Sequence, residues 1–427
     1  MRLLVEELKG SLDKVQKMVG DNKNPLGVLL RKEDDDNLAV CYSDGKKAMV
    51  DIITMEDGSG LDSDVILPYK NFIDTVNSYA NSGDLRTQYV DLEFNSESTI
   101  VTLSAVCELI IKTGEFNEDN EEIVNYKVAN IFKDKIKYIN PETSGSRYEI
   151  LTRCDYASII SLDDYDEWNK SNLQTLLNKL NKEDGKICYI ASKLKAGFVA
   201  NTAYVSFIPT EDVDRFGFTA TSKVAKCIVD VLSKVATNKV YVYVEDSRYC
   251  RIMADDGKFG VWFEVAPGKP IDANKLAKYQ KVKTPDGNEV DRQYNDYRLV
   301  MNRASIAFAV KRALNSDKND SSTLQVVNNG DSWSVVLNND KNREASDNRL
   351  VLDACSDTKG DIEELRLPFS LKLLSDIVNS CSGEVIIMAF ENAEDNKSVL
   401  LKIGDVSRDK ENKTTILGSY YTMVAKK

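Results

Sequence analysis

The sequence contains no histidine among its 427 residues. Histidine is the side chain that titrates nearest neutral pH, and it is the commonest general base and metal ligand in proteins. Its absence removes Ser-His and Cys-His nucleophile pairs and most zinc sites. We therefore expect a protein that is not an enzyme and that has no metal or other cofactor.

Paired cysteines and long apolar runs are also missing. The 8 cysteines are scattered through apolar segments without a CxxC pair, so we expect buried free thiols. No run approaches the roughly 18 apolar residues of a membrane helix, and the first residues turn polar before a secretory signal could form. These features predict a cytoplasmic protein that does not contact a membrane.

Acidic residues outnumber basic ones by 68 to 56, which gives a formal net charge of −12. This balance argues against a protein whose whole surface neutralises nucleic-acid phosphates. A protein that encloses DNA escapes the argument, because it can be acidic outside and basic only on the helices that line its hole.

Amphipathic segments recur along the chain at intervals of about 150 residues, a sign of internal repetition. One kind follows a short apolar strand, near Leu4, Leu151 and Leu299, which are spaced 147 and 148 apart. Between the helical segments the pattern alternates with period two, as in half-buried strands. Each unit is therefore predicted to run strand, helix, several strands, helix, several strands.

A second kind of helical segment starts at a turn or capping signal in each unit. Pro68 and Pro368 stand where proline is tolerated, at or just before a first helical turn, and Thr221 or Ser222 can cap the corresponding middle segment. We therefore predict an α+β chain of three similar domains at residues 1–140, 141–290 and 291–427, with a helical insertion near 168–185 in the middle one.

This organisation resembles that of the bacterial β sliding clamp. The best local matches are the paired strands at 335–340 and 350–352, and the terminal segment 420–427, in which Met423 aligns with a methionine of the family. The resemblance departs from the family where Val424 replaces a proline and Ala425 replaces a larger apolar residue. The segment 201–204, Asn-Thr-Ala-Tyr, also stands in place of the family's Asp-Gly-His-Arg turn.

The resemblance implies three copies of the DNA-clamp fold arranged in an arc, half of a six-domain ring. Two chains would join head to tail as a homodimer around double-stranded DNA, held without sequence preference. The function implied is that of a processivity factor that tethers a DNA polymerase, with the polymerase and a clamp loader binding through short peptide motifs.

For such a ring, the polar faces of the helices should be basic. Apolar stripes such as Leu8, Leu12 and Val15 should face the core, and lysines should face the DNA phosphates. An ordinary solvated helix face is the alternative for each single lysine. The candidates are Lys14, Lys17, Lys70, Lys223, Lys226, Lys234, Lys311, Arg312 and Lys372.

The resemblance also implies an apolar groove for partner peptides between the second and third units. Met423 has plain core packing as its alternative role. The candidates are Val199, Asn201, Thr202, Tyr204, Val205, Tyr421, Met423 and Ala425.

Other classes of protein stay open at this point. A β-rich viral coat or tail protein would also contain repeated strands, and an enzyme with paired carboxylates, such as a glycosidase, would not need histidine. Within the clamp class, three units per chain favour two chains per ring over three. The composition, rich in Lys, Asn and Asp, suggests a bacteriophage source.

Overall fold

The structure is a computed structural model, and it divides into two compact units. Unit 1 comprises Met1–Gln174 and Lys226–Val265, and unit 2 comprises Thr175–Ala225 and Ala266–Lys427. The structure describes residues 1–79, 81, 83–158, 165–180, 187–192, 196–200, 205–209, 217–246, 248–265, 279–294, 297–316, 321–328, 333–339, 349–352, 354–357, 366–390, 398–411 and 413–425.

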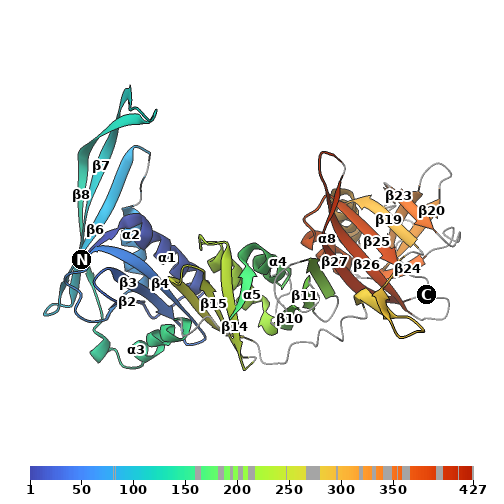
Figure 1. Cartoon of the computed structure of the whole chain (residues 1–427), viewed down its shortest axis with the longest axis horizontal. Helices are drawn as coiled ribbons and strands as arrows, with labels where there is room; N and C mark the ends of the chain where they lie inside the picture. The colour runs from blue at the N-terminus through green and yellow to red at the C-terminus, as the bar shows by residue number, and fades with distance from the viewer. Residues whose placement is uncertain are drawn as a thin grey trace. The chain divides into compact units, whose positions relative to one another are not determined.

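One order of elements, strand, helix, four strands, helix, three strands, occurs three times along the chain (Figure 1). The first copy consists of β1 (Arg2–Leu4), α1 (Val5–Val19), β2 (Val28–Lys32), β3 (Asn37–Ser43), β4 (Lys47–Asp57), β5 (Val65–Leu67), α2 (Tyr69–Ser78), β6 (Leu85–Asn95), β7 (Ile100–Phe116) and β8 (Glu122–Lys137). The second consists of β9 (Asp166–Asn169), α4 (Lys170–Leu180), β10 (Ile187–Ser192), β11 (Ala196–Ala200), β12 (Val205–Pro209), β13 (Gly217–Thr221), α5 (Ser222–Leu232), β14 (Lys239–Glu245), β15 (Tyr249–Ala254) and β16 (Phe259–Glu264).

In the third copy the fourth strand is split in two. This copy consists of β19 (Tyr297–Asn302), α7 (Arg303–Ser316), β20 (Ser321–Asn328), β21 (Trp333–Asn339), β22 (Arg349–Val351), β23 (Ala354–Asp357), β24 (Arg366–Ser370), α8 (Leu371–Ser380), β25 (Val385–Phe390), β26 (Ser398–Arg408) and β27 (Thr414–Ala425). Between the copies lie the connector η1 (Pro141–Thr143), α3 (Ser146–Leu151) and η2 (Thr152–Ala157), and the hairpin β17 (Lys281–Lys283) and β18 (Glu289–Asp291).

Strand pairing repeats together with the element order. In the first copy β2 pairs with β3 and β5, and β1 pairs with β4 and β6. In the third copy β20 pairs with β21 and β24, and β19 pairs with β23 and β25. In the second copy β10 pairs with β11 and β13, and β9 pairs with β14. The predicted α+β class with three copies of one fold is therefore confirmed, whereas the domain bounds 1–140, 141–290 and 291–427 stay predictions.

The structure differs from the sequence interpretation in the middle copy. The segment that begins at Leu151 contains the end of α3 and the short 3-10 helix η2, both in the connector. The helix predicted as an insertion is α4, which follows β9 as α1 follows β1. Leu151, Cys154 and Ala157 are buried at helical spacing, but they pack with Trp262 of β16. Their spacing from Leu4 and Leu299 therefore does not mark equivalent positions.

In unit 1 the helices and the connector cover opposite faces of one sheet. Strand β4 is central, and its side chains alternate between the two faces. Val50 belongs to an apolar cluster with Leu151 of α3 on one face. Asp51 bonds to Lys14 of α1 on the other. The sheet continues from β4 into β16, where residues 259–263 pair antiparallel with residues 51–47.

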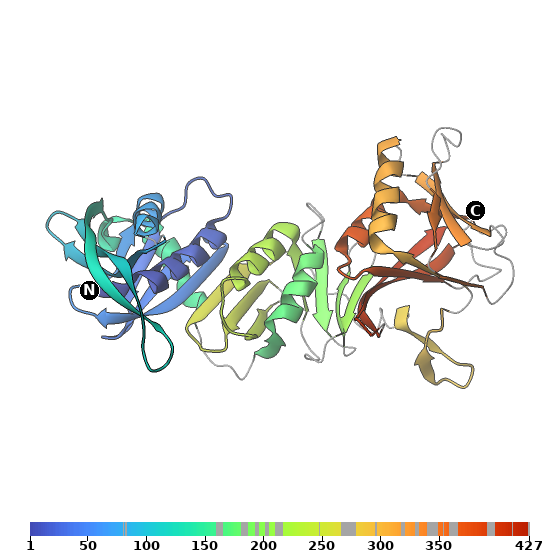
Figure 2. The same cartoon turned by 90° about the horizontal axis from the view of Figure 1, so that it is seen from above.

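In unit 2 the helices α7 and α8 lie on one face of the sheet β19-β25-β26-β27 (Figure 2). A large apolar core lies between this sheet and the helices. Leu299, Met388 and Ile403 face this core from successive strands. The same sheet continues from β27 into β12, where Val205 pairs with Tyr421. No helix of the described residues is long and apolar enough to cross a membrane.

Candidate nucleic-acid interface and partner groove

The helices are basic in a chain that is acidic overall. The six described helices of ten or more residues, α1, α2, α4, α5, α7 and α8, contain twelve Lys and Arg against six Asp and Glu. The whole chain contains 56 against 68. These helices therefore have an excess of basic residues in a chain with an excess of acidic ones, and α4 and α7 contain no acidic residue at all.

Local sequence signals explain where these helices start. The Thr221 hydroxyl accepts a hydrogen bond from the Val224 backbone N–H at 3.3 Å, and Ser370 caps α8 by accepting one from Leu373 at 3.0 Å. Pro68 is the residue before α2, as the sequence predicts. Pro368 instead lies in β24, paired with Thr323, so the third helix starts at Leu371.

Most of the predicted DNA-facing side chains are exposed. Lys226 makes an ion pair with Asp230 at 2.5 Å, and Lys234, which lies just after α5, pairs with Asp13 at 3.3 Å. Such exposed pairs contribute little to stability, so the lysines can exchange these partners for phosphate oxygens. The exposed residues are Lys70, Lys223, Lys226, Lys234, Lys311, Arg312 and Lys372, and Lys17 is half-buried.

Lys14 does not project from the helix face as the sequence suggested. Its ammonium donates to both carboxylate oxygens of Asp51 at 2.8 Å and lies 5.2 Å from the Phe259 ring centroid. Its side chain is only 17% exposed. Lys14 does lie outside the apolar stripe of α1, as the helical pattern predicts. The neighbouring strand β4, however, presents the buried carboxylate of Asp51 to it. Lys14 is therefore a structural cation rather than a DNA contact.

Replacing Lys14 by methionine is expected to lower the free energy of unfolding by about 3 kcal/mol at pH 8, because a buried carboxylate loses its partner. Burial raises the pKa of Asp51 above its ordinary value, although Lys14 opposes the shift. A carboxyl group with a raised folded-state pKa contributes more to stability at low pH and loses this contribution as pH rises through that pKa. The loss of unfolding free energy caused by Lys14→Met should therefore be smaller at pH 5, because a protonated Asp51 carboxyl does not need a cationic partner.

Urea unfolding followed by tryptophan fluorescence measures this effect, since Trp168 and Trp262 are buried in the same unit. The double variant Lys14→Met/Asp51→Asn is the control and should recover most of the lost stability. An equal loss of unfolding free energy at pH 5 and pH 8 would contradict the assignment of Lys14 as the partner of the buried Asp51 carboxylate.

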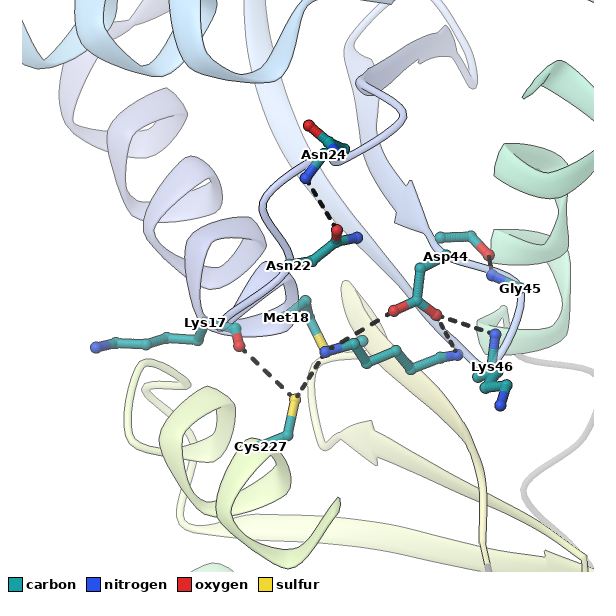
Figure 3. Close-up of polar contacts among 10 residues, drawn as sticks. Lys17, Met18, Asn22, Asn24, Asp44, Gly45, Lys46 and Cys227 are labelled. Carbon is teal, nitrogen blue, oxygen red and sulfur yellow. Dashed lines mark hydrogen bonds and ion pairs between the residues drawn. The ribbon is translucent and has the colours of Figure 1, made fainter. Parts of the chain in front are cut away.

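The junction of α1 and α5 positions Lys17 (Figure 3). The Cys227 thiol of α5 donates to the Lys17 carbonyl oxygen at 3.7 Å and lies 3.9 Å from the Met18 sulfur. The Lys17 side chain points away from these contacts. Burial raises the pKa of Cys227, so its thiol stays protonated and serves packing. This agrees with the free thiols of Cys41, Cys107, Cys154, Cys227, Cys250 and Cys381.

The structure brings part of the predicted partner groove together. Strands β11, β12 and β27 are neighbours, which places Val199 on β11 two strands from Tyr421 on β27. Met423 and Ala425 continue β27, where they pair with Leu400 and Ser398. Asn201, Thr202 and Tyr204 lie outside the described residues, as do the side chains of Val199, Val205, Met423 and Ala425.

Two tyrosines that the sequence analysis did not single out cover Tyr421. The ring centroids of Tyr279 and Tyr294 lie 6.0 and 5.9 Å from that of Tyr421, which is only 3% exposed. Both precede β19 and flank the β17–β18 hairpin. The only sequence signal is this hairpin, with its turn at Asp286 and Gly287, because nothing local predicts where it packs. Tyr421 is thus a covered residue rather than an open groove wall.

Two strands that could continue a sheet have a partner on one side only among the described residues. Each of the two continuous sheets joins one copy to the next in the same way. β4, the fourth strand of the first copy, pairs with β16, the last strand of the second copy. β12, the fourth strand of the second copy, pairs with β27, the last strand of the third copy. Among the described residues, β8, the last strand of the first copy, pairs only with β7. Likewise β22, the start of the fourth strand of the third copy, pairs only with β21. In the part of the chain that the structure describes, one edge of each complementary kind therefore has no second strand beside it.

Comparison with solved structures shows the same fold over the whole chain. The β subunit of DNA polymerase III from Thermotoga maritima superimposes with a TM-score of 0.62 at 13% identity, covering 100% of this chain and 99% of that one. A DNA polymerase sliding clamp from Pseudomonas aeruginosa gives a TM-score of 0.64 at 13% identity, with 100% and 99% covered. The sliding clamp from Bacillus subtilis gives 0.62 at 11% identity, with 100% and 98% covered.

No protein-family model matches the sequence, and no curated protein matches it either. The likeness is therefore one of structure, and it confirms the DNA-clamp fold that the sequence pattern suggested.

Proposed function

We propose that this chain, which has the fold of the bacterial DNA polymerase sliding clamp, is itself a DNA sliding clamp and not an enzyme. It would encircle duplex DNA and keep a replicative DNA polymerase attached to its template. The observation that carries the proposal is the threefold repeat, which has this fold from end to end and whose described strands include two complementary sheet edges without a second partner. A location in the cytoplasm, in a bacterium or a phage-infected cell, follows from that role.

Closure of the ring would use the joint that the chain already makes twice. A second copy can place its β8 beside β22 of the first, and its own β22 beside the β8 of the first. Both new joints would join a fourth strand to a last strand, as in the two joints within the chain. Such a head-to-tail contact between identical chains closes after two copies if each spans half a turn. It would also satisfy edge N–H and C=O groups that otherwise face solvent.

The charge distribution suits a ring that slides. Lysines and arginines on the helices can contact phosphates without reading bases, so the contacts are the same at every position along the duplex. The acidic remainder of the chain disfavours binding of DNA elsewhere on the surface. The ring would therefore hold DNA by enclosure rather than by tight contacts.

Polymerase and clamp loader are the proposed protein partners, recognised through short peptide motifs near β12 and β27. Because Tyr279 and Tyr294 cover Tyr421, the peptides would enter beside Met423 and Ala425 or would displace the tyrosines. The groove would therefore accept motifs different from those that fit an open apolar channel.

Mass photometry combined with DNA co-elution tests the proposed function. We expect a particle of twice the 47.8 kDa chain mass, which elutes with nicked circular DNA and is released when that DNA is cut to a linear form. A chain that stays monomeric at micromolar concentration and is not retained on circular DNA would refute the proposal. Extended tubes or shells would instead support the coat-protein alternative, which the fold comparisons do not favour.

A further inference from the structure

A pocket of about 330 Å³ lies on the face of the unit 2 sheet opposite α7 and α8. It is lined by side chains of β19, β25, β26 and β27 and by the segment Arg292–Tyr294. Its size fits one or two amino-acid side chains of a ligand.

The pocket is positively charged on one side. Arg292, Arg298 and Lys402 line it, and no Asp or Glu is among the described residues that do so. In the sheet, Arg298 pairs with Ala389, and Ala389 pairs with Lys402, so the two cations share a face with one strand between them. Their backbones are thus about 10 Å apart, a separation that two long side chains can bridge to reach one anionic group.

Lys402 is held in place by aromatic rings. Its ammonium lies 5.5 Å from the Tyr294 ring centroid and 5.8 Å from that of Tyr421. Burial and the nearby charge of Arg298 lower the pKa of Lys402, and the charge of Asp291 opposes them. Among the described residues, no carboxylate forms an ion pair with Lys402 or Arg298. An arriving carboxylate would relieve this repulsion and add charge-assisted hydrogen bonds.

The rest of the lining is mixed, with polar side chains at Gln293, Thr414 and Ser419 and an apolar part formed by Ile387, Ala389, Val406 and Ile416. Ile387 and Val406 belong to a small apolar cluster on this face, and Ile416 is 55% exposed. A ligand that combines an apolar side chain with neighbouring carboxylates therefore matches both halves of the pocket. A small inorganic anion would use only the charged half.

We propose that this pocket binds an acidic peptide segment of a partner protein, with carboxylates at Arg298 and Lys402 and an apolar side chain against Ile387 and Ile416. The proposal rests on the geometry of unit 2 alone, so it stands or falls independently of ring closure. It adds to the surface near Met423 a second contact that selects partners by charge.

Fluorescence anisotropy with the full-length protein tests the proposal. The probe is a labelled, terminally blocked pentapeptide, Asp-Glu-Leu-Glu-Asp, and its neutral counterpart is Asn-Gln-Leu-Gln-Asn. The variant Arg298→Glu/Lys402→Met removes both cations, while methionine keeps an unbranched side chain between the tyrosine rings. The variant Lys311→Met/Arg312→Glu on α7, across the sheet, changes the net charge equally and is the matched control.

We expect the acidic peptide to bind at least tenfold more weakly to the pocket variant than to the wild type and the α7 variant, and the neutral peptide to bind to none of them. Equal affinity of the two peptides would overturn the proposal, because the site would then be only apolar. Displacement of the peptide by an equimolar amount of inorganic phosphate would overturn it in favour of a small-anion site. If the double variant does not show the wild-type thermal transition, the single variant Arg298→Glu at an exposed position decides the question.

Discussion

Replacing Lys135 by proline is expected to convert a dimeric ring into monomers that are not retained on closed circular DNA. Lys135 lies on β8, the open edge that we propose for ring closure. Proline has no backbone N–H and cannot donate to a neighbouring strand. A lost donor and an unpaired acceptor cost about 2 kcal/mol at each of two interfaces, which corresponds to about a thousandfold in the dissociation constant of the dimer.

The hydrogen bonds of β8 make Lys135 the appropriate position. The Tyr138 N–H donates to the Thr99 carbonyl oxygen at 2.9 Å, so the N–H of Tyr138 faces β7. Backbone groups of an antiparallel strand point alternately to its two sides. The N–H of Lys135 therefore points to the open edge, and proline is tolerated on an edge strand in that orientation. The pairing of β8 with β7 should remain intact.

Mass photometry across a range of protein concentrations measures the dissociation constant directly. The variant Lys135→Ala removes the same exposed side chain but keeps the N–H, and it should stay dimeric and remain on circular DNA. A proline variant with an unchanged thermal transition and an unchanged dimer would show that β8 does not form the joint.

The sequence predicted the repeat because each helix has its own local signals. The apolar stripe of α1 places Leu8, Leu12 and Val15 in the core, as expected. The start of α5 follows from the Thr221 cap. These features depend on residues within one or two turns, so periodicity and capping rules identify them without knowledge of the tertiary structure.

Features that depend on distant partners were not predictable. Lys14 is engaged by Asp51, which is 37 positions away on a neighbouring strand. Leu151 has helical spacing, but it belongs to a connector because Trp262 of β16 supplies its packing surface. The cover over Tyr421 depends on where the β17–β18 hairpin packs. In each case the local sequence pattern was compatible with several structural roles, and the role is determined by a contact with a residue distant in the sequence.

Reversing two charges on α7 should separate electrostatic contact with DNA from enclosure. Lys311 and Arg312 are exposed on a helix that contains no acidic residue. We expect Lys311→Glu/Arg312→Glu to weaken equilibrium binding to a short duplex about tenfold at low salt. The slope of the logarithm of the binding constant against the logarithm of salt concentration should fall by about 2. Fluorescence anisotropy over a salt series measures both quantities.

Retention of the same variant on closed circular DNA should change little. Once the ring is closed, escape requires separation of a sheet joint, and the helix charges do not contribute to that barrier. The matched control is Arg408→Glu/Lys410→Glu, which places the same charge change at exposed positions at the end of β26 and in the following turn. This control should leave both binding and the salt slope unchanged. If retention falls in parallel with short-duplex affinity, contact and not enclosure holds the protein on DNA, and the ring proposal fails.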